Sequence, residues 1–199
     1  MRKKFLLAVL VLLVVLSAQA FAAISGDPIK NYDLPMLITN AGQGPGGKLA
    51  RLLVSQTKTI ILDTDYFYES EPERPELVTR KYSCLMVIIG STDKGLGASG
   101  ITIEDEIQRL QRVVEVCKEI NLPIVAVLLE QDKRASGIPT NANERCIDLI
   151  CPNAEWMIVV KRGNSDGRFD EIKAKYNIPL TIIDSQSDFI ALAKKIFNR

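Results

Sequence analysis

The chain has 199 residues, of which 25 are basic and 24 acidic, and it contains no histidine. Its formal net charge of +1 gives no sign of the clustered basic surface that nucleic-acid binding requires. The lack of histidine excludes serine–histidine and cysteine–histidine nucleophile pairs, and also metal sites that need imidazole.

The N-terminus has the pattern of a secretory signal peptide. Basic residues at 2–4 precede an apolar run over 5–16, and the small-residue sequence Ala-Gln-Ala follows at 18–20. The run is shorter than the roughly 20 residues of a membrane span, so we expect a cleaved signal, with an uncleaved anchor as the alternative. Cleavage after residue 20, 22 or 23 would leave an exported protein, periplasmic or extracellular, without a stable membrane span.

Three segments follow from this pattern. We expect a signal peptide over residues 1–20, a mobile lead-in over 21–34 and a single α/β domain over 35–199. Removing the signal leaves 22 basic and 24 acidic residues. The remaining length is sufficient for one domain with a sizeable core.

Short apolar runs alternate with amphipathic segments along the rest of the chain. Strands are expected over 36–39, 59–62, 84–90, 124–129, 156–160 and 180–183. Helices are expected over 48–56, 102–119, 143–150, 169–176 and 189–196.

The central strand at 84–90 is apolar almost throughout, as is the strand at 124–129, which is typical of strands buried on both faces. Strands that alternate with helices predict a parallel sheet with helices on both sides. We therefore expect an α/β fold with three layers: a doubly wound, mostly parallel sheet of five to six strands, flavodoxin-like or Rossmann-like.

Helix ends are marked by local signals. Thr102 with Asp105 forms a potential capping box, and Ser185 with Asp188 can cap the last helix. The sequences Asn-Leu-Pro at 121–123 and Asn-Ile-Pro at 177–179 each predict a helix that ends in a left-handed asparagine before a strand.

The segment 63–81 interrupts the alternation with many carboxylates, three aromatic residues and two prolines. A solvated connection is the simplest interpretation, and a lid over the pocket or a calcium-binding loop are the alternatives. The carboxylates lack the glycine and terminal glutamate spacing of an EF-hand loop.

Four cysteines leave two disulfide pairings open in an exported protein. Cys84 and Cys117 could meet at the bottom of the sheet, or both could be reduced core residues. A bridge between Cys146 and Cys151 would distort the end of a helix.

The expected ligand crevice lies beyond the carboxyl ends of the strands, where the strand order reverses. For an order 2-1-3-4-5 this point falls between the first and third strands, whose loops at 39–48 and 90–100 are both rich in glycine. Glycine allows close approach of a ligand, and helix N-termini offer donors to an anion. The candidate ligand-binding residues are Thr39, Asn40, Gln43, Ser91, Lys94, Gly95, Gly97, Gly100, Glu130, Arg134 and Asn164.

Three partial motifs lie in these loops, and each departs from its full pattern. Residues 42–48 match most of a phosphate-binding P-loop, but Leu49 stands where serine or threonine should hold magnesium. The glycines at 95, 97 and 100 match a dinucleotide fingerprint but start five residues too late after the strand. Ser91 with Lys94 has the spacing of a Ser-x-x-Lys nucleophile and base, but Lys94 is expected in a loop. No cofactor is assigned.

Several of these residues also carry a resemblance to a family. They are Gly90-Ser91, Lys94-Gly95-Leu96-Gly97, Gly100-Ile101, Glu106, Arg109, Gly163-Asn164 and Asp166-Gly167. From about Leu34 to the C-terminus the chain resembles an exported bacterial family catalogued only as a domain of unknown function. The resemblance implies an exported α/β domain, and it assigns neither an activity nor a catalytic residue.

The leading hypothesis for function is a non-catalytic extracytoplasmic module that binds a small polar or anionic ligand in the two glycine loops. The second is a histidine-free hydrolase or transferase in which Ser91 or Asp93 acts with Lys94. The third is an interaction scaffold, with an envelope protein as its partner, whose glycine loops are only tight turns.

Overall fold

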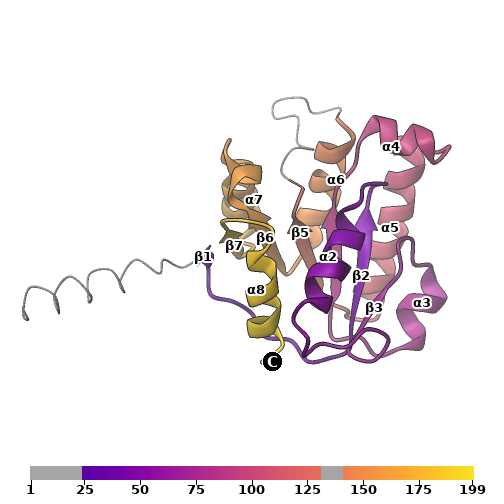
Figure 1. Ribbon diagram of the computed structural model, residues 1–199. Coiled ribbons are helices and arrows are strands. Elements are labelled where there is room, and N and C mark those ends of the chain that lie inside the picture. Colours follow the sequence, from indigo (N-terminus) through magenta and orange to yellow (C-terminus); the bar gives the residue numbers. More distant parts are fainter. Residues whose placement is uncertain (1–23, 131–140) are drawn as a thin grey trace, which may run out of the picture.

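The computed structural model describes residues 24–130 and 141–199 as an α/β fold around one mixed sheet (Figure 1). The expected signal peptide and Arg134 lie outside the described residues. The strands are β1 (Ile24–Gly26), β2 (Met36–Ala41), β3 (Tyr66–Tyr68), β4 (Leu85–Ile89), β5 (Ile124–Leu128), β6 (Trp156–Val160) and β7 (Leu180–Ile183). The helices are α2 (Gly46–Ser55), α3 (Arg74–Thr79), α4 (Asp93–Ala98), α5 (Ile103–Glu119), α6 (Ala142–Ile150), α7 (Arg168–Tyr176) and α8 (Asp188–Ile196).

The sheet has seven strands, so the expected count of five to six was too low. Its order is β1-β7-β6-β5-β4-β2-β3. Strands β2 to β7 are parallel, and β1 pairs antiparallel with β7. The order reverses between β2 and β4, because the chain first adds β3 on one side of β2 and then returns to place β4 on the other side.

Helices cover both faces of the sheet. Helices α2 and α8 pack on one face, and α3, α5, α6 and α7 pack on the other. Every residue of β4, β5 and β6 is buried, as their apolar sequences predict. Among the described residues, no helix combines the length and apolarity that a membrane span requires.

The strand expected over 59–62 is wrong, because the edge strand β3 forms later, at Tyr66–Tyr68. Positive φ angles at Lys58 and Asp63 turn the chain on either side of the expected strand. The fully buried Tyr66 fills the sheet edge instead. The acidic segment 63–81 is therefore more than a connection, since it supplies both β3 and α3.

Residues 24–34, which fall in the lead-in expected over 21–34, make specific contacts with the domain. Besides the pairing of β1 with β7, the Asp27 carboxylate accepts the Leu180 backbone N–H at 2.7 Å and lies 2.5 Å from Lys173 Nζ. These contacts hold the pKa of Asp27 below its usual value, first through the backbone hydrogen bond and then through Lys173. The short strand lacked a sequence signal because it is only three residues long.

The predicted capping box of α5 and both predicted asparagine helix ends are confirmed. Asn121 and Asn177 both have φ of 55°, in the left-handed region. The Thr102 hydroxyl accepts the Asp105 N–H at 3.1 Å, and the Asp105 carboxylate accepts the Thr102 N–H at 2.9 Å. The cap expected from Ser185 is wrong, because the N-cap of α8 is Ser187, which makes no side-chain cap hydrogen bond. Ser185 instead donates both its N–H and its hydroxyl to the Asp188 carboxylate.

All four cysteines are buried, and none forms a disulfide in the described structure. Cys84 belongs to the core under α2 and α8, whereas Cys117 lies in the core on the opposite face of the sheet, so the two thiols cannot meet. Cys146 and Cys151 lie in the same hydrophobic core, with no disulfide between them. Burial raises the pKa of Cys84, Cys117 and Cys146 to about 12 in each case.

We expect none of these thiols to react with iodoacetamide in the native protein at pH 8, because alkylation needs an accessible thiolate. In urea without reductant all four should react, which intact-mass spectrometry would count. A labelled native protein, or an unfolded protein that takes fewer than four labels, would contradict the buried, reduced arrangement.

Candidate functional site

The two glycine loops meet at the point where the strand order reverses, as predicted, but they pack directly on each other. A Cβ at Gly42 would lie 2.3 Å from the Cβ of Ser91, and a Cβ at Gly44 would lie 2.2 Å from the Gly90 carbonyl oxygen. Such distances leave no room for a side chain or a ligand between the loops. The glycines are needed for close packing of the backbone.

Glu130 fills the place beside α2 that the P-loop-like sequence suggests for a phosphate. This side chain is 8% exposed, and its Oε1 atom would lie 2.7 Å from a Cβ at Gly46 and 2.8 Å from one at Gly90. A carboxylate near a helix N-terminus is electrostatically favourable. The protein's own carboxylate thus occupies this position.

Ser91 has no exposed surface, and its backbone N–H donates to Asn143 Oδ1 at 2.9 Å. The tight packing of Gly42 above it keeps substrates away, which argues against Ser91 as a nucleophile. Lys94 lies in helix α4 rather than in the expected loop, and both it and Asp93 are exposed.

The remaining candidates divide into two groups. Thr39, Asn40 and Gln43 gather at the end of β2, where the Thr39 hydroxyl donates to the Ser70 carbonyl at 3.1 Å and Gln43 donates to Glu71 at 2.6 Å. Gly95 packs against Gln43, because a Cβ added at Gly95 would lie 3.1 Å from the Gln43 carbonyl oxygen.

The second group lies away from this place. Gly97 and Gly100 are exposed, and a Cβ added at either would meet nothing within 4 Å. The side chain of Asn164 is used at the start of α7, where it accepts the Phe169 N–H at 2.8 Å and donates to Asp170 at 2.7 Å. These residues do not join a common site.

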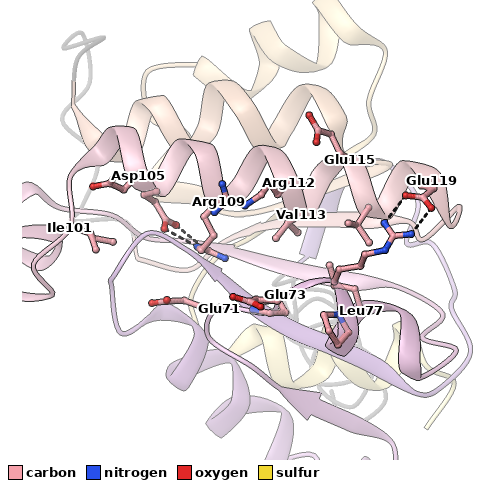
Figure 2. Close-up of a pocket in the computed structure, with 15 residues that line it drawn as sticks. Glu71, Glu73, Leu77, Ile101, Asp105, Arg109, Arg112, Val113, Glu115 and Glu119 are labelled. Carbon is pink, nitrogen blue, oxygen red and sulfur yellow. Dashed lines mark hydrogen bonds and ion pairs between the residues drawn. The ribbon is translucent and has the colours of Figure 1, made fainter.

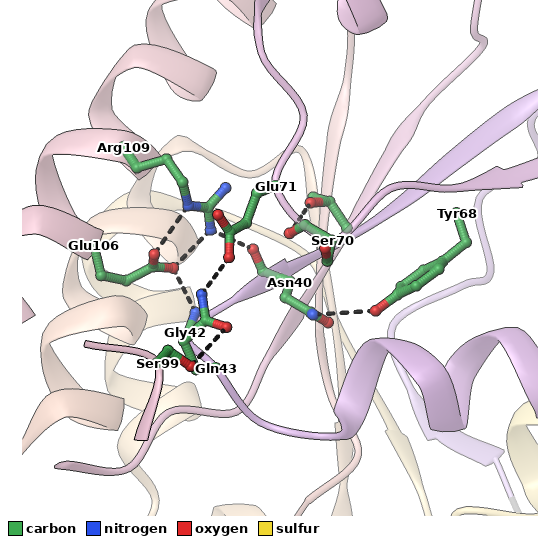
Figure 3. Close-up of polar contacts among 10 residues, drawn as sticks. Asn40, Gly42, Gln43, Tyr68, Ser70, Glu71, Ser99, Glu106 and Arg109 are labelled. Atoms are coloured by element: carbon green, nitrogen blue, oxygen red, sulfur yellow. Dashed lines mark hydrogen bonds and ion pairs between the residues drawn. The ribbon is translucent and has the colours of Figure 1, made fainter. Parts of the chain in front are cut away.

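Two residues that sequence reasoning did not assign to the site hold it together (Figure 3). Glu106 is fully buried and accepts the Gly42 N–H at 2.6 Å. Arg109 donates to both Glu106 oxygens, at 2.9 and 2.6 Å, and to the Asn40 carbonyl at 2.9 Å. A sequence signal existed, because Glu106 falls on the same helical stripe as the apolar residues Ile103 and Leu110.

A groove of about 650 Å³ runs between α5 and the segment that leads into α3 (Figure 2). Arg109 lines it, and a bidentate pair between Arg74 and Glu119, at 2.5 and 2.6 Å, lies at its far end. Arg109 Nη1 is buried and has no hydrogen-bond partner within residues 24–130 and 141–199. The same holds for Asn40 Oδ1, whose amide nitrogen donates to the Tyr68 hydroxyl at 3.3 Å.

No part of the described chain groups three or more histidine, cysteine or carboxylate side chains in a way that could hold a metal ion. The calcium-binding alternative for 63–81 therefore has no ligand cluster among these residues.

Comparison with family models finds a match over most of the chain. The model for DUF6305, a domain of unknown function, matches residues 33–197. The chain belongs to the DUF6305 family. The DUF6305 match begins after β1 and ends one residue beyond α8, so it includes the two glycine loops, Glu106, Arg109 and Glu130.

Solved structures similar to this DUF6305 domain include a crystal structure of a GDP-L-fucose synthetase from Naegleria fowleri bound to NADP. The TM-score is 0.41 and the identity 8%, over 71% of this chain and 54% of that chain. The chain thus spans about half the length of that enzyme. Comparison with curated proteins gave no match.

Proposed function

We propose that this DUF6305 protein is an exported, non-catalytic module that binds a small polar or anionic ligand. The glycine loops are filled by their own backbone and by Glu130, so we assign the ligand to the adjacent groove between α5 and α3. The observation that carries the proposal is the buried Arg109 Nη1, which has no partner among the described residues at the wall of this groove.

Arg109 is suited to this role because its other donors fix its position. Glu106 and the Asn40 carbonyl hold Nε and Nη2, so the guanidinium is oriented before a ligand arrives. A buried N–H without an acceptor costs about 1–3 kcal/mol. Since Nη1 has almost no exposed surface, a neighbouring side chain must shift before a ligand oxygen can reach it. A carboxylate, phosphate or carbonyl oxygen that then accepts from Nη1 would remove this cost.

Export is proposed from the N-terminal sequence alone. A protein outside the cytoplasm meets little nucleotide triphosphate, which agrees with a P-loop-like sequence that surrounds a protein carboxylate instead of a phosphate. The lack of an accessible nucleophile at Ser91 favours binding over catalysis.

The test starts with the protein purified from its own host. Native mass spectrometry would identify a retained molecule, and a thermal-shift screen of carboxylates, phosphates, sugars and nucleotides would find one that stabilises the fold. Affinity for the hit is then measured by calorimetry, well below the melting temperature, for Arg109→Lys and for Lys94→Gln.

Arg109→Lys should weaken binding at least tenfold, because lysine loses the fork that reaches both Glu106 and the ligand. Lys94→Gln should leave binding unchanged. The reverse result would place the ligand at α4 and the glycine loops. A screen in which no compound binds would refute the binding proposal.

A further inference from the structure

A second hollow, of about 540 Å³, lies beside the edge strand β3 and is independent of the ligand groove. We call it the β3-edge hollow. Its exposed lining comes from α2 and from the turn that follows it: Lys48, Arg51, Leu52, Ser55, Lys58 and Ile61.

The hollow combines two features that a plain solvent-facing surface lacks. Leu52 is 53% exposed and Ile61 is 52% exposed, the highest values for large apolar side chains among the described residues. Scattered exposed apolar residues are ordinary, but two of the most exposed ones sharing one concavity mark an interaction surface.

The turn that carries Ile61 is rigidly held. The Ile61 carbonyl oxygen accepts the N–H groups of Asp65 and Tyr66, at 2.7 and 3.2 Å. The Ile61 N–H donates to the Asp65 carboxylate at 2.9 Å. The Asp63 N–H also bonds to the Tyr66 carbonyl, which covers the outer side of β3 at this point. Ile61 is therefore presented in a fixed position, and pairing of an added strand at Tyr66 is blocked.

The charged side chains that line the hollow all have one sign. Lys48, Arg51 and Lys58 line it, no carboxylate does, and none of the three forms a salt bridge in the part of the chain that the structure describes. The nearest carboxylates in the sequence, Asp63 and Asp65, lie outside the lining.

From this combination we infer that the β3-edge hollow docks an acidic segment of another protein, with an apolar side chain seated between Leu52 and Ile61. Complementary charge sets the partner's sign and speeds association. A concave surface fits a protruding side chain better than the flat face of a bilayer.

A displayed library of 12-residue random peptides tests this inference on the purified protein. The selected peptides should be rich in aspartate and glutamate around one large apolar residue, and their binding should weaken as salt rises. The double variant Lys48→Glu/Lys58→Glu should lose at least tenfold in affinity. Leu52→Ser should weaken binding while the salt dependence of the remaining affinity stays unchanged.

Lys118→Glu/Lys175→Glu makes the same change in net charge on exposed residues away from the hollow and should bind like the original protein. Selected peptides without an acidic bias, or equal losses in both double variants, would overturn the inference. So would self-association in sedimentation, or binding to anionic vesicles, that Leu52→Ser abolishes, because the occupant would then be a second copy or a membrane. None of these outcomes depends on Arg109, so failure here leaves the ligand groove untouched.

Discussion

Gly42→Ala is expected to lower the free energy of unfolding by about 3 kcal/mol, through left-handed strain and overpacking together. Gly42 has φ of 95°, and its added Cβ would lie 2.3 Å from the Ser91 Cβ and 2.6 Å from the Ser91 Cα. Neither atom is the end of a flexible side chain, so the two loops would have to separate. Urea unfolding monitored by fluorescence of the single tryptophan, the buried Trp156, measures the effect.

Gly97→Ala is the matched control in the other glycine loop. Its Cβ would meet nothing within 4 Å, and the residue lies in helix α4. Alanine is the better helix former by roughly 0.5–1 kcal/mol, so stability should stay equal or rise slightly. Equal destabilisation by both variants would mean that the loops do not pack as described.

Glu106→Gln is expected to destabilise the protein by about 3 kcal/mol, because it leaves the largely buried guanidinium of Arg109 without its counter-charge. Glu106 has no exposed side-chain surface and Arg109 has only 14%. The variant also weakens the acceptor for the Gly42 N–H, so the glycine loop should loosen with it. Urea unfolding gives the stability, and faster hydrogen exchange at the Gly42 amide would show the local effect.

Glu104→Gln on the same helix removes an exposed partner of Arg145, with 63% of the Glu104 side chain accessible. Surface pairs contribute little, so this control should unfold close to the original protein. A Glu106→Gln protein as stable as this control would show that the buried pair does not hold the loop.

The sequence predicted the central part of the fold well, because hydrophobic pattern and helix-end chemistry agree there. The buried strands β4, β5 and β6 are short apolar runs, and Asn121 and Asn177 end their helices for a local reason that sequence alone reveals. The edge strands β1 and β3 were not predicted, because their local sequence carries no such signal. β1 and β3 have three residues each, and their pairing partners, not their own composition, make them strands.

The meeting of the two glycine loops was predicted correctly, but their close packing on each other was not. Strand order brought the two glycine loops together as expected, yet glycine serves equally for a ligand's approach and for a neighbouring backbone's approach. Only the distances from Gly42 and Gly44 to the facing loop show that a neighbouring backbone, and not a ligand, lies against these glycines. Glu106 was recoverable as a charge on an apolar stripe, whereas the unused Nη1 of Arg109 depends on the positions of residues far apart in the chain.

The antiparallel pairing of β1 determines where the chain enters the domain. β1 and β3 are the two ends of the strand order, so six strand spacings, about 29 Å, separate them. A tether joined to the chain at Ile24 therefore enters at the edge opposite the β3-edge hollow. A sensor surface that holds the protein by this end leaves the β3 edge facing the solution, which makes N-terminal immobilisation the right geometry for measuring a partner.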